Sequence, residues 1–102
     1  MNILVDDFKT YGQMVIDQLK EYAKTQKSWA LEQENYEGVR VNLNRCNGNG
    51  WFLLRLSLHD PLLPLNIESN DKGGAKIIAS ELAKFIKNYD KLVAKTLLDF
   101  AE

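Results

Sequence analysis

Residues 39–57 read VRVNLNRCNGNGWFLLRLS, and the order of residue types in this run predicts an antiparallel hairpin. Apolar and polar residues alternate from Val39 to Leu43, which is the two-residue period of a half-buried strand. Two Asn-Gly pairs over 47–50 then supply residues that tolerate a positive φ, as a tight hairpin turn requires. The run Trp51–Ser57 is therefore expected to pair antiparallel with the run that ends at Leu43.

Regular structure is expected on both sides of this hairpin. Before it, apolar residues recur every three or four positions, which predicts a helix over about 6–25 after a short strand at 3–5. Residues 26–35 are mostly polar and indicate a loop, with a short extended piece at 29–31. After the hairpin a third extended run is expected over 62–68. Pro64 has no N–H to donate, so we expect an unpaired side or a bulge there.

The chain ends in a long apolar stripe, for which Asn70 or Asp71 is the expected helix cap. The stripe predicts one final helix, with a continuation from Leu97 to Phe100. Its members are Ile77, Ile78, Leu82, Phe85, Ile86, Tyr89, Leu92 and Val93. The order helix, three strands, helix predicts an α+β fold, a small antiparallel sheet of three to four strands with an N-terminal and a C-terminal helix packed on one face.

Length and composition limit the classes of protein to consider. A chain of 102 residues with 45% hydrophobic residues predicts a single domain over 1–102. The net charge of -1 argues against a nucleic-acid or anionic-membrane binder, since those carry a basic excess. The longest apolar runs, such as 51–54, are far shorter than the ~20 residues that span a bilayer. A lone cysteine, Cys46, and the absence of an Asn-x-Ser/Thr acceptor favour a reduced cytoplasmic setting.

The candidate site lies in residues 55–61. On a strand Arg55 and Ser57 point to the same side, and His59 follows as the chain turns before Pro61. A guanidinium offers a planar fork of donors that fits phosphate oxygens, and hydroxyl, imidazole and backbone N–H groups can complete the cradle. An arginine on a sheet face more often pairs with a carboxylate, so spacing alone favours a structural ion pair over a ligand site.

Longer motifs add to this interpretation. The segment Glu37-Gly38-Val39-Arg40-Val41 is followed by Gly50-Trp51, by Arg55-Leu56-Ser57-Leu58-His59-Asp60-Pro61 and by Glu68. In order and spacing, residues 37–86 resemble the C-terminal domain of the α-D-phosphohexomutases, the phosphoglucomutase and phosphomannomutase family. The resemblance implies the TBP-like fold of that domain. It also implies that the 55–59 loop holds the phosphate at the non-reacting end of a hexose phosphate.

Site residues follow from the resemblance one position at a time. It implies that Arg55 grips the phosphate, Ser57 donates through its hydroxyl and Leu58 donates its backbone N–H. His59 stands where the family usually has threonine and can also donate. The loop diverges from the family pattern, since it has leucine at 56 and 58 in place of proline and a small residue, and Pro64 replaces a usual arginine.

The same resemblance limits what the chain can do alone. The complete enzymes of this family use Mg²⁺ and a phosphoserine, and both belong to other domains. We therefore expect no catalytic residue, metal site or cofactor in this chain, and no turnover by it in isolation. The expected partner is a phosphosugar, bound together with missing upstream domains of an isomerase that interconverts hexose 1- and 6-phosphates. The alternative is a non-catalytic interaction module that keeps the fold without the function of the loop.

Other residue patterns are weaker candidates. His59-Asp60 offers only two metal ligands, and Gly73-Gly74 at a helix start is more often a conformational aid than an anion site. Cys46 has no obvious activating base beside it. An aromatic platform for nucleobases would need a basic stripe, so core packing is the expected role of Trp29, Tyr36 and Trp51.

Overall fold

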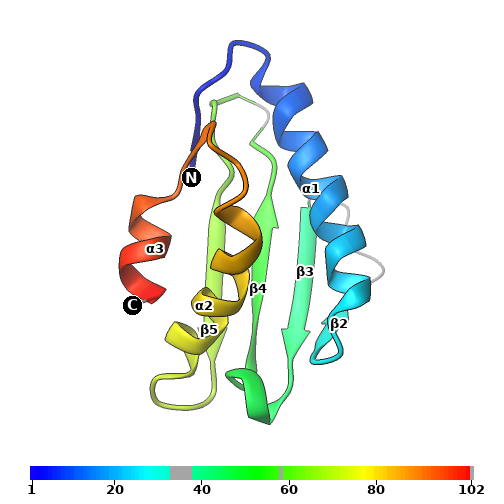
Figure 1. The fold of residues 1–102 in the computed structure, drawn as a ribbon, viewed down its shortest axis with the longest axis vertical. Helices are drawn as coiled ribbons and strands as arrows, with labels where there is room; N and C mark the ends of the chain where they lie inside the picture. The colour runs from blue at the N-terminus through cyan, green and yellow to red at the C-terminus, as the bar shows by residue number, and fades with distance from the viewer. Residues whose placement is uncertain (33–37, 58, 102) are drawn as a thin grey trace.

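The computed structural model describes residues 1–32, 38–57 and 59–101, in which helices cover one face of an antiparallel sheet (Figure 1). The sheet has four strands, and each pairs antiparallel with its neighbours. In spatial order they are β2 (Trp29–Leu31), β3 (Gly38–Leu43), β4 (Gly50–Arg55) and β5 (Leu65–Ser69). Helices α1 (Phe8–Thr25) and α2 (Gly74–Ile86) lie on the same face of it. The predicted α+β class, sheet type and helix placement are confirmed.

Shorter elements complete the fold at the sides of the sheet. Strand β1 (Asn2–Ile3) pairs antiparallel with β6 (Leu92–Val93), and α3 (Lys95–Ala101) follows β6. A 3₁₀ turn, η1 (Arg45–Asn47), connects β3 to β4. Figure 1 shows α3 beside β5, with both chain ends on that side of the molecule.

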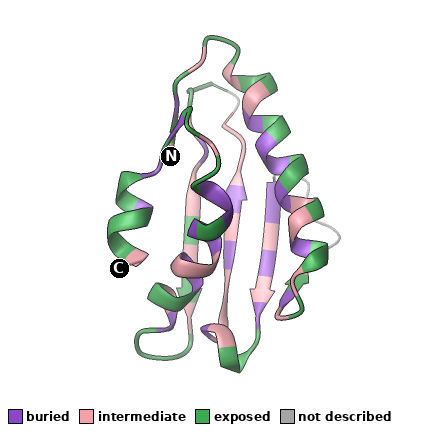
Figure 2. Ribbon diagram, in the orientation of Figure 1, coloured by how far each residue is buried: buried purple, intermediate pink, exposed green. Residues whose placement is uncertain are grey.

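One core lies between the sheet and the helices (Figure 2). Along β3 and β4 every second side chain is buried, as the predicted two-residue period requires. The inward side chains of these strands are Val39, Val41, Leu43, Phe52 and Leu54. Their neighbours in the sequence point to the other face, which no described helix covers.

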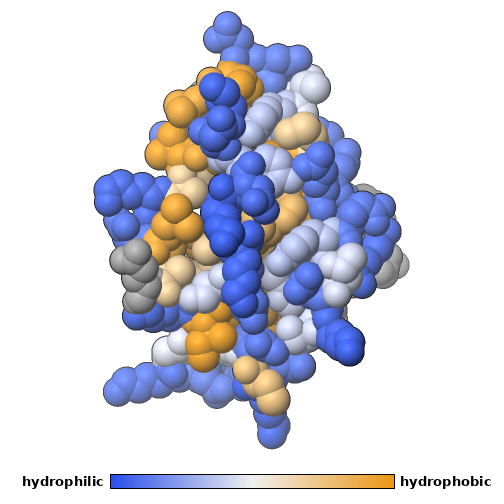
Figure 3. All heavy atoms as spheres, in the orientation of Figure 1, coloured by the Kyte–Doolittle hydropathy of each residue, from blue (hydrophilic) through white to orange (hydrophobic). Residues whose placement is uncertain are grey.

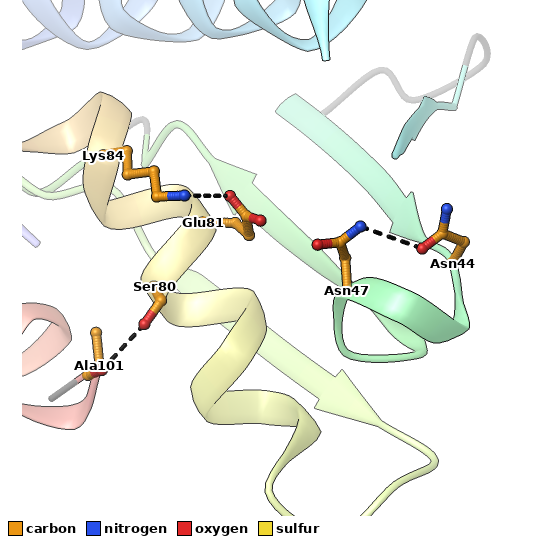
Figure 4. A network of polar contacts seen from close by, with 6 residues as sticks. All are labelled: Asn44, Asn47, Ser80, Glu81, Lys84 and Ala101. Carbon is orange, nitrogen blue, oxygen red and sulfur yellow. Dashed lines mark hydrogen bonds and ion pairs between the residues drawn. The ribbon is translucent and has the colours of Figure 1, made fainter. Parts of the chain in front are cut away.

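The β3–β4 connection differs in detail from a two-residue turn. Gly48 and Asn49 have φ values of 106° and 50°, so the Asn-Gly pairs do supply the positive φ that was predicted. The chain reverses over six residues, 44–49, because η1 is inserted before Gly48. The Asn44 side chain accepts hydrogen bonds from the Cys46 N–H at 3.1 Å and from Asn47 Nδ2 at 3.3 Å, and these bonds hold the turn (Figure 4).

Helix α1 begins where an acidic side chain can cap it. Asp7 Oδ1 accepts a hydrogen bond from the Thr10 N–H at 3.4 Å, and it satisfies one of the free donors of the first turn. Apolar residues at three- and four-residue spacing then face the core along the helix. The predicted helix over about 6–25 is therefore confirmed.

We expect Asp7→Ala to lower the free energy of unfolding by about 1 kcal/mol, because the Thr10 N–H loses its acceptor. Thermal denaturation followed by circular dichroism would measure this loss as a lower melting temperature. Asp6→Ala is the matched control, since Asp6 is equally exposed and lies one residue outside the cap. Equal losses in the two variants would contradict a capping role for Asp7.

The predicted cap of the last long helix is wrong. Gly73, with φ of 79°, is the N-cap of α2, and no side chain caps the helix. Asp71 contributes its backbone carbonyl to the Gly74 N–H at 3.0 Å, and its carboxylate accepts from Asn49 Nδ2 at 3.2 Å. Asp71 therefore connects the turn before α2 to the β3–β4 turn through its hydrogen bond with Asn49.

The prediction of one continuous final helix is also wrong. Helix α2 ends at Ile86, where Asn88 Nδ2 donates to the Phe85 carbonyl at 3.1 Å, and the chain then forms β6 and α3. Leu92 leaves the helix pattern because its backbone pairs with Ile3 of β1. The apolar spacing continued past Ile86 because Leu92 of β6 and Leu97 of α3 are buried in the same core as α2, whereas Val93 is 43% exposed.

Candidate functional site

Arg55 is the last residue of β4, at the end of the sheet away from η1. Its N–H donates to the Pro64 carbonyl at 2.9 Å, and its Cα lies opposite Gly38 on β3. By the alternation of the strand, Arg55 shares the uncovered face of the sheet with Leu53 and Trp51. The predicted strand continued to Ser57, whereas the structure ends it at Arg55.

Gly38 is required by the close approach of β3 to β4 at this point. A Cβ on residue 38 would lie 2.0 Å from the Leu54 carbonyl oxygen and 2.9 Å from Arg55 Cα. Both are backbone atoms, so a side chain here would push the two strands apart. The glycine of the Glu37-Gly38-Val39 motif thus determines how closely β3 supports Arg55, while Glu37 lies outside the described residues.

Ser57 begins the loop that follows β4. Its N–H donates to the Leu62 carbonyl at 3.4 Å, which closes the loop at its base. Its Oγ accepts from the Asp60 N–H at 3.2 Å, and a hydroxyl that accepts in this way can still donate its own proton to a ligand. The loop is therefore a short closed turn with a hydroxyl donor at its start.

His59 and Asp60 are exposed in this loop, so the imidazole is presented to solvent close to Ser57. Leu58, whose backbone N–H was predicted to contribute to the site, lies outside the described residues. Of the four predicted site residues, the structure brings Arg55, Ser57 and His59 to one end of the sheet. This placement follows from their positions at the end of β4 and in the turn after it.

The N-terminal strand supports the far side of the loop. The Ile3 N–H donates to the Pro61 carbonyl at 2.7 Å, and the N–H of Leu63 donates to the Met1 carbonyl at 2.7 Å. Asn2 and Leu62 form a bridge between these two bonds. Contacts between residues about 60 positions apart in the sequence thus hold the returning part of the loop, and no local sequence pattern indicated this pairing.

Leu56 is a packing residue between Arg55 and Ser57. Its Cδ1 lies so close to α1 that a Cβ on Gly12 would be 2.6 Å from it. Leu56 also lines an open groove of about 700 Å³ along α1, together with Lys9, Thr10 and Gln13. Leu56 therefore packs the loop against α1, and the same groove carries one positive charge at Lys9 and one acidic side chain at Asp17.

Arg40 is a residue of this face that sequence reasoning did not single out. It lies opposite Leu53, which is two residues before Arg55 on β4. Its guanidinium stacks over the Trp51 ring, with 4.3 Å between the guanidinium carbon and the ring centroid. Arg40 Nε is buried and has no hydrogen-bond partner among the described residues. Two arginines therefore share one face, and the strand alternation with the hairpin register would have identified the second.

The structure also places the weaker candidates of the sequence analysis. Within the ranges described, no group of three or more His, Cys, Asp or Glu side chains could hold a metal ion. Gly74 is needed for packing, since a Cβ there would lie 2.3 Å from the Gly48 carbonyl oxygen. Cys46 is exposed in η1, and Trp29 is buried in the core as predicted. Core packing is wrong for Trp51, which lies on the uncovered face of the sheet against Arg40. Tyr36, the third member of the aromatic set, lies outside the described residues.

No protein-family model matches the chain, and no curated protein matches it. Among the described helices, none combines the length and the apolar character needed to cross a bilayer.

Proposed function

We propose that this chain is the C-terminal, substrate-phosphate-binding domain of a phosphoglucomutase or phosphomannomutase type of isomerase, which interconverts hexose 1- and 6-phosphates. The observation that carries the proposal is the juxtaposition of Arg55, Ser57 and His59 at one end of the sheet. These are the positions at which the α-D-phosphohexomutases present their phosphate-binding loop.

Physical chemistry supports a phosphate at this place. A guanidinium binds two phosphate oxygens through parallel N–H groups, and hydrogen bonds to a charged acceptor contribute about 1.5–3 kcal/mol each. The Ser57 hydroxyl can donate a further bond while its oxygen accepts from the Asp60 N–H. Arg40 lies on the uncovered face of the sheet and Lys9 on the α1 side. Their positive charges would favour a bound phosphate even without touching it.

The role proposed for the chain is binding and orientation, with the chemistry performed elsewhere. Phosphoryl transfer depends on a donor and on charge neutralisation by a metal ion. In the proposed enzyme the phosphoserine and Mg²⁺ belong to other domains. Arg55 and Ser57 would hold the non-reacting phosphate, so that the other end of the sugar is directed at those groups.

The test is an NMR titration of the ¹⁵N-labelled chain with glucose 1,6-bisphosphate. We expect saturable shifts of the amide signals of Arg55, Ser57 and His59. Glucose at the same concentration is the matched control for the sugar, and sodium sulfate controls for a simple dianion. Bisphosphate shifts that are absent, or that spread evenly over the surface, would contradict a phosphate site at this loop and would favour a non-catalytic interaction module.

A second experiment measures enzymatic turnover by the isolated chain. We expect the isolated chain to give no detectable interconversion of glucose 1-phosphate and glucose 6-phosphate, even with Mg²⁺ and glucose 1,6-bisphosphate present. Detectable turnover that scales with the concentration of the chain and survives its repurification would overturn the assignment to a binding domain.

A further inference from the structure

The outer edge of β5 carries backbone groups that no described strand uses. Strand β5 is the last strand of the sheet. The Pro64 carbonyl accepts from the Arg55 N–H, and the Asn70 N–H donates to the Asn49 carbonyl, so even-numbered residues bond toward β4. The N–H and C=O groups of Leu65 and Ile67 therefore point away from the sheet.

The outward-pointing residue before Leu65 is Leu63, and the N-terminal strand already pairs with it. The N-terminal ammonium group of Met1 donates to the Leu63 carbonyl at 2.8 Å, and the Leu63 N–H donates to the Met1 carbonyl at 2.7 Å. Met1 and Leu63 thus form a hydrogen-bonded antiparallel pair. The next outward-pointing residues along the same edge are Leu65 and Ile67. A strand in line with β1 would lie opposite these open groups.

An apolar pocket lies beside the same edge, on the helix side of the sheet. It has a volume of about 320 Å³ and is lined by Met1, by Leu65 and Ile67 from β5, by Ala75 from α2, and by Thr96, Leu97 and Phe100 from α3. The pocket is large enough to receive apolar side chains from a neighbouring strand. In an antiparallel pair, directly opposite residues share a face, so residues opposite Leu65 and Ile67 would project into it.

Helix α3 forms the outer wall of this pocket and is hydrogen-bonded to α2. Ser80 Oγ of α2 donates to the Ala101 carbonyl at 3.0 Å (Figure 4). Phe100 of α3 nevertheless remains 52% exposed, and Leu98 remains 38% exposed. Figure 3 shows several apolar areas on the side of α3 and the chain ends, whereas the α1 side is mostly hydrophilic. Exposed apolar side chains beside an open strand edge are typical of a binding surface.

We propose that the β5 edge binds an extended polypeptide segment of a partner, which runs antiparallel to β5 in line with β1. The segment has apolar residues at every second position, opposite Leu65 and Ile67. Backbone hydrogen bonds to the edge provide affinity, and the pocket beside α3 selects the alternate apolar side chains. This surface is separate from the Arg55 loop, so its test is independent of the proposed phosphate site.

The first measurement is amide hydrogen exchange of the chain as it stands. We expect the amides of Leu65 and Ile67 to exchange at least tenfold faster than those of Asn66 and Glu68, which bond to β4. Equal protection of the two sets would mean that the edge is not open, and it would overturn the proposal.

The second measurement supplies the strand at high effective concentration, by adding six residues before Met1. In the test extension valine is the second, fourth and sixth residue before Met1, with threonine between, so that valines lie opposite Leu65 and Ile67. We expect exchange of the Leu65 and Ile67 amides to slow at least tenfold, while the amide signals of Arg55 and Ser57 stay unchanged.

Two control extensions separate the parts of the proposal. One has proline at the second and fourth positions, which removes the N–H groups that would donate to Leu65 and Ile67. The other exchanges the valine and threonine positions, so that composition is kept and the apolar face turns away from the pocket. We expect the Leu65 and Ile67 amides to gain no protection from the proline extension. We expect the extension with exchanged valine and threonine positions to protect them less than the test extension does. Equal protection by all three extensions, or by none, would overturn the proposal.

Discussion

Replacing Phe52 with alanine is expected to lower the free energy of unfolding by about 3–5 kcal/mol. Phe52 has no exposed surface and lies at the centre of β4, opposite Val41 on β3 and Ile67 on β5. Its ring packs edge-to-face on Trp29, with 5.3 Å between the ring centroids. Truncation would leave a cavity that the surrounding strands and helices cannot close, because backbone pairing on both sides fixes the position of β4.

Urea denaturation followed by tryptophan fluorescence would measure this loss as a lower midpoint. Leu53→Ala is the matched control on the next residue of the strand, since Leu53 is only partly buried and faces the uncovered side. We expect it to cost less than half as much as Phe52→Ala. A loss below about 1 kcal/mol for Phe52→Ala, or equal losses for the two variants, would contradict the placement of the core.

Arg55→Ala is expected to weaken binding of glucose 1,6-bisphosphate by at least tenfold, or about 1.4 kcal/mol. The variant removes two donors and a positive charge from the proposed phosphate site. Arg55 lies at the end of β4, so the core positions that precede it in the strand are left intact. The measurement is the same NMR titration, in which the amide shifts of Ser57 and His59 should no longer saturate in the accessible concentration range.

Arg45→Ala is the matched control for this variant. Arg45 is exposed in η1, at the opposite end of the sheet, and its replacement changes the net charge by the same amount. We expect the control to bind like the unmodified chain. If both variants lose affinity equally, binding depends on overall charge, and Arg55 has no specific role.

Much of the strand layout could be predicted because it depends on local periodicity. Alternation from Val39 to Leu43 and the Asn-Gly pairs after it were sufficient for the β3–β4 hairpin, since inward side chains and positive φ angles are properties of consecutive residues. The same alternation predicted Arg55 and Ser57 on one side of a strand, but β4 ends at Arg55 and Ser57 belongs to the loop that follows. Glycine at 48 is required in the observed turn because its φ is positive.

The end of the last long helix could not be predicted in this way. Tyr89, Leu92 and Val93 fit the period of a helix, yet the chain leaves α2 at Ile86. The competing structure is the pairing of β6 with β1, whose residues are about 90 positions earlier in the sequence. The apolar period did not separate one helix from three elements, because Leu82 of α2, Leu92 of β6 and Leu97 of α3 are buried in one core.

The sequence by itself determined the sheet type, the antiparallel pairing of β3 with β4 and the order of the groups at the candidate site. Those features depend on neighbours in the chain. Only the tertiary structure decided how the loop after β4 is supported. The N-terminal strand hydrogen-bonds to Pro61 and Leu63, and Gly12 of α1 lacks a side chain and so leaves room for Leu56. The tertiary structure likewise decided that the β5 edge stays open beside an apolar pocket. These arrangements join segments distant in sequence, and the packing and hydrogen bonds that select them have no local signature.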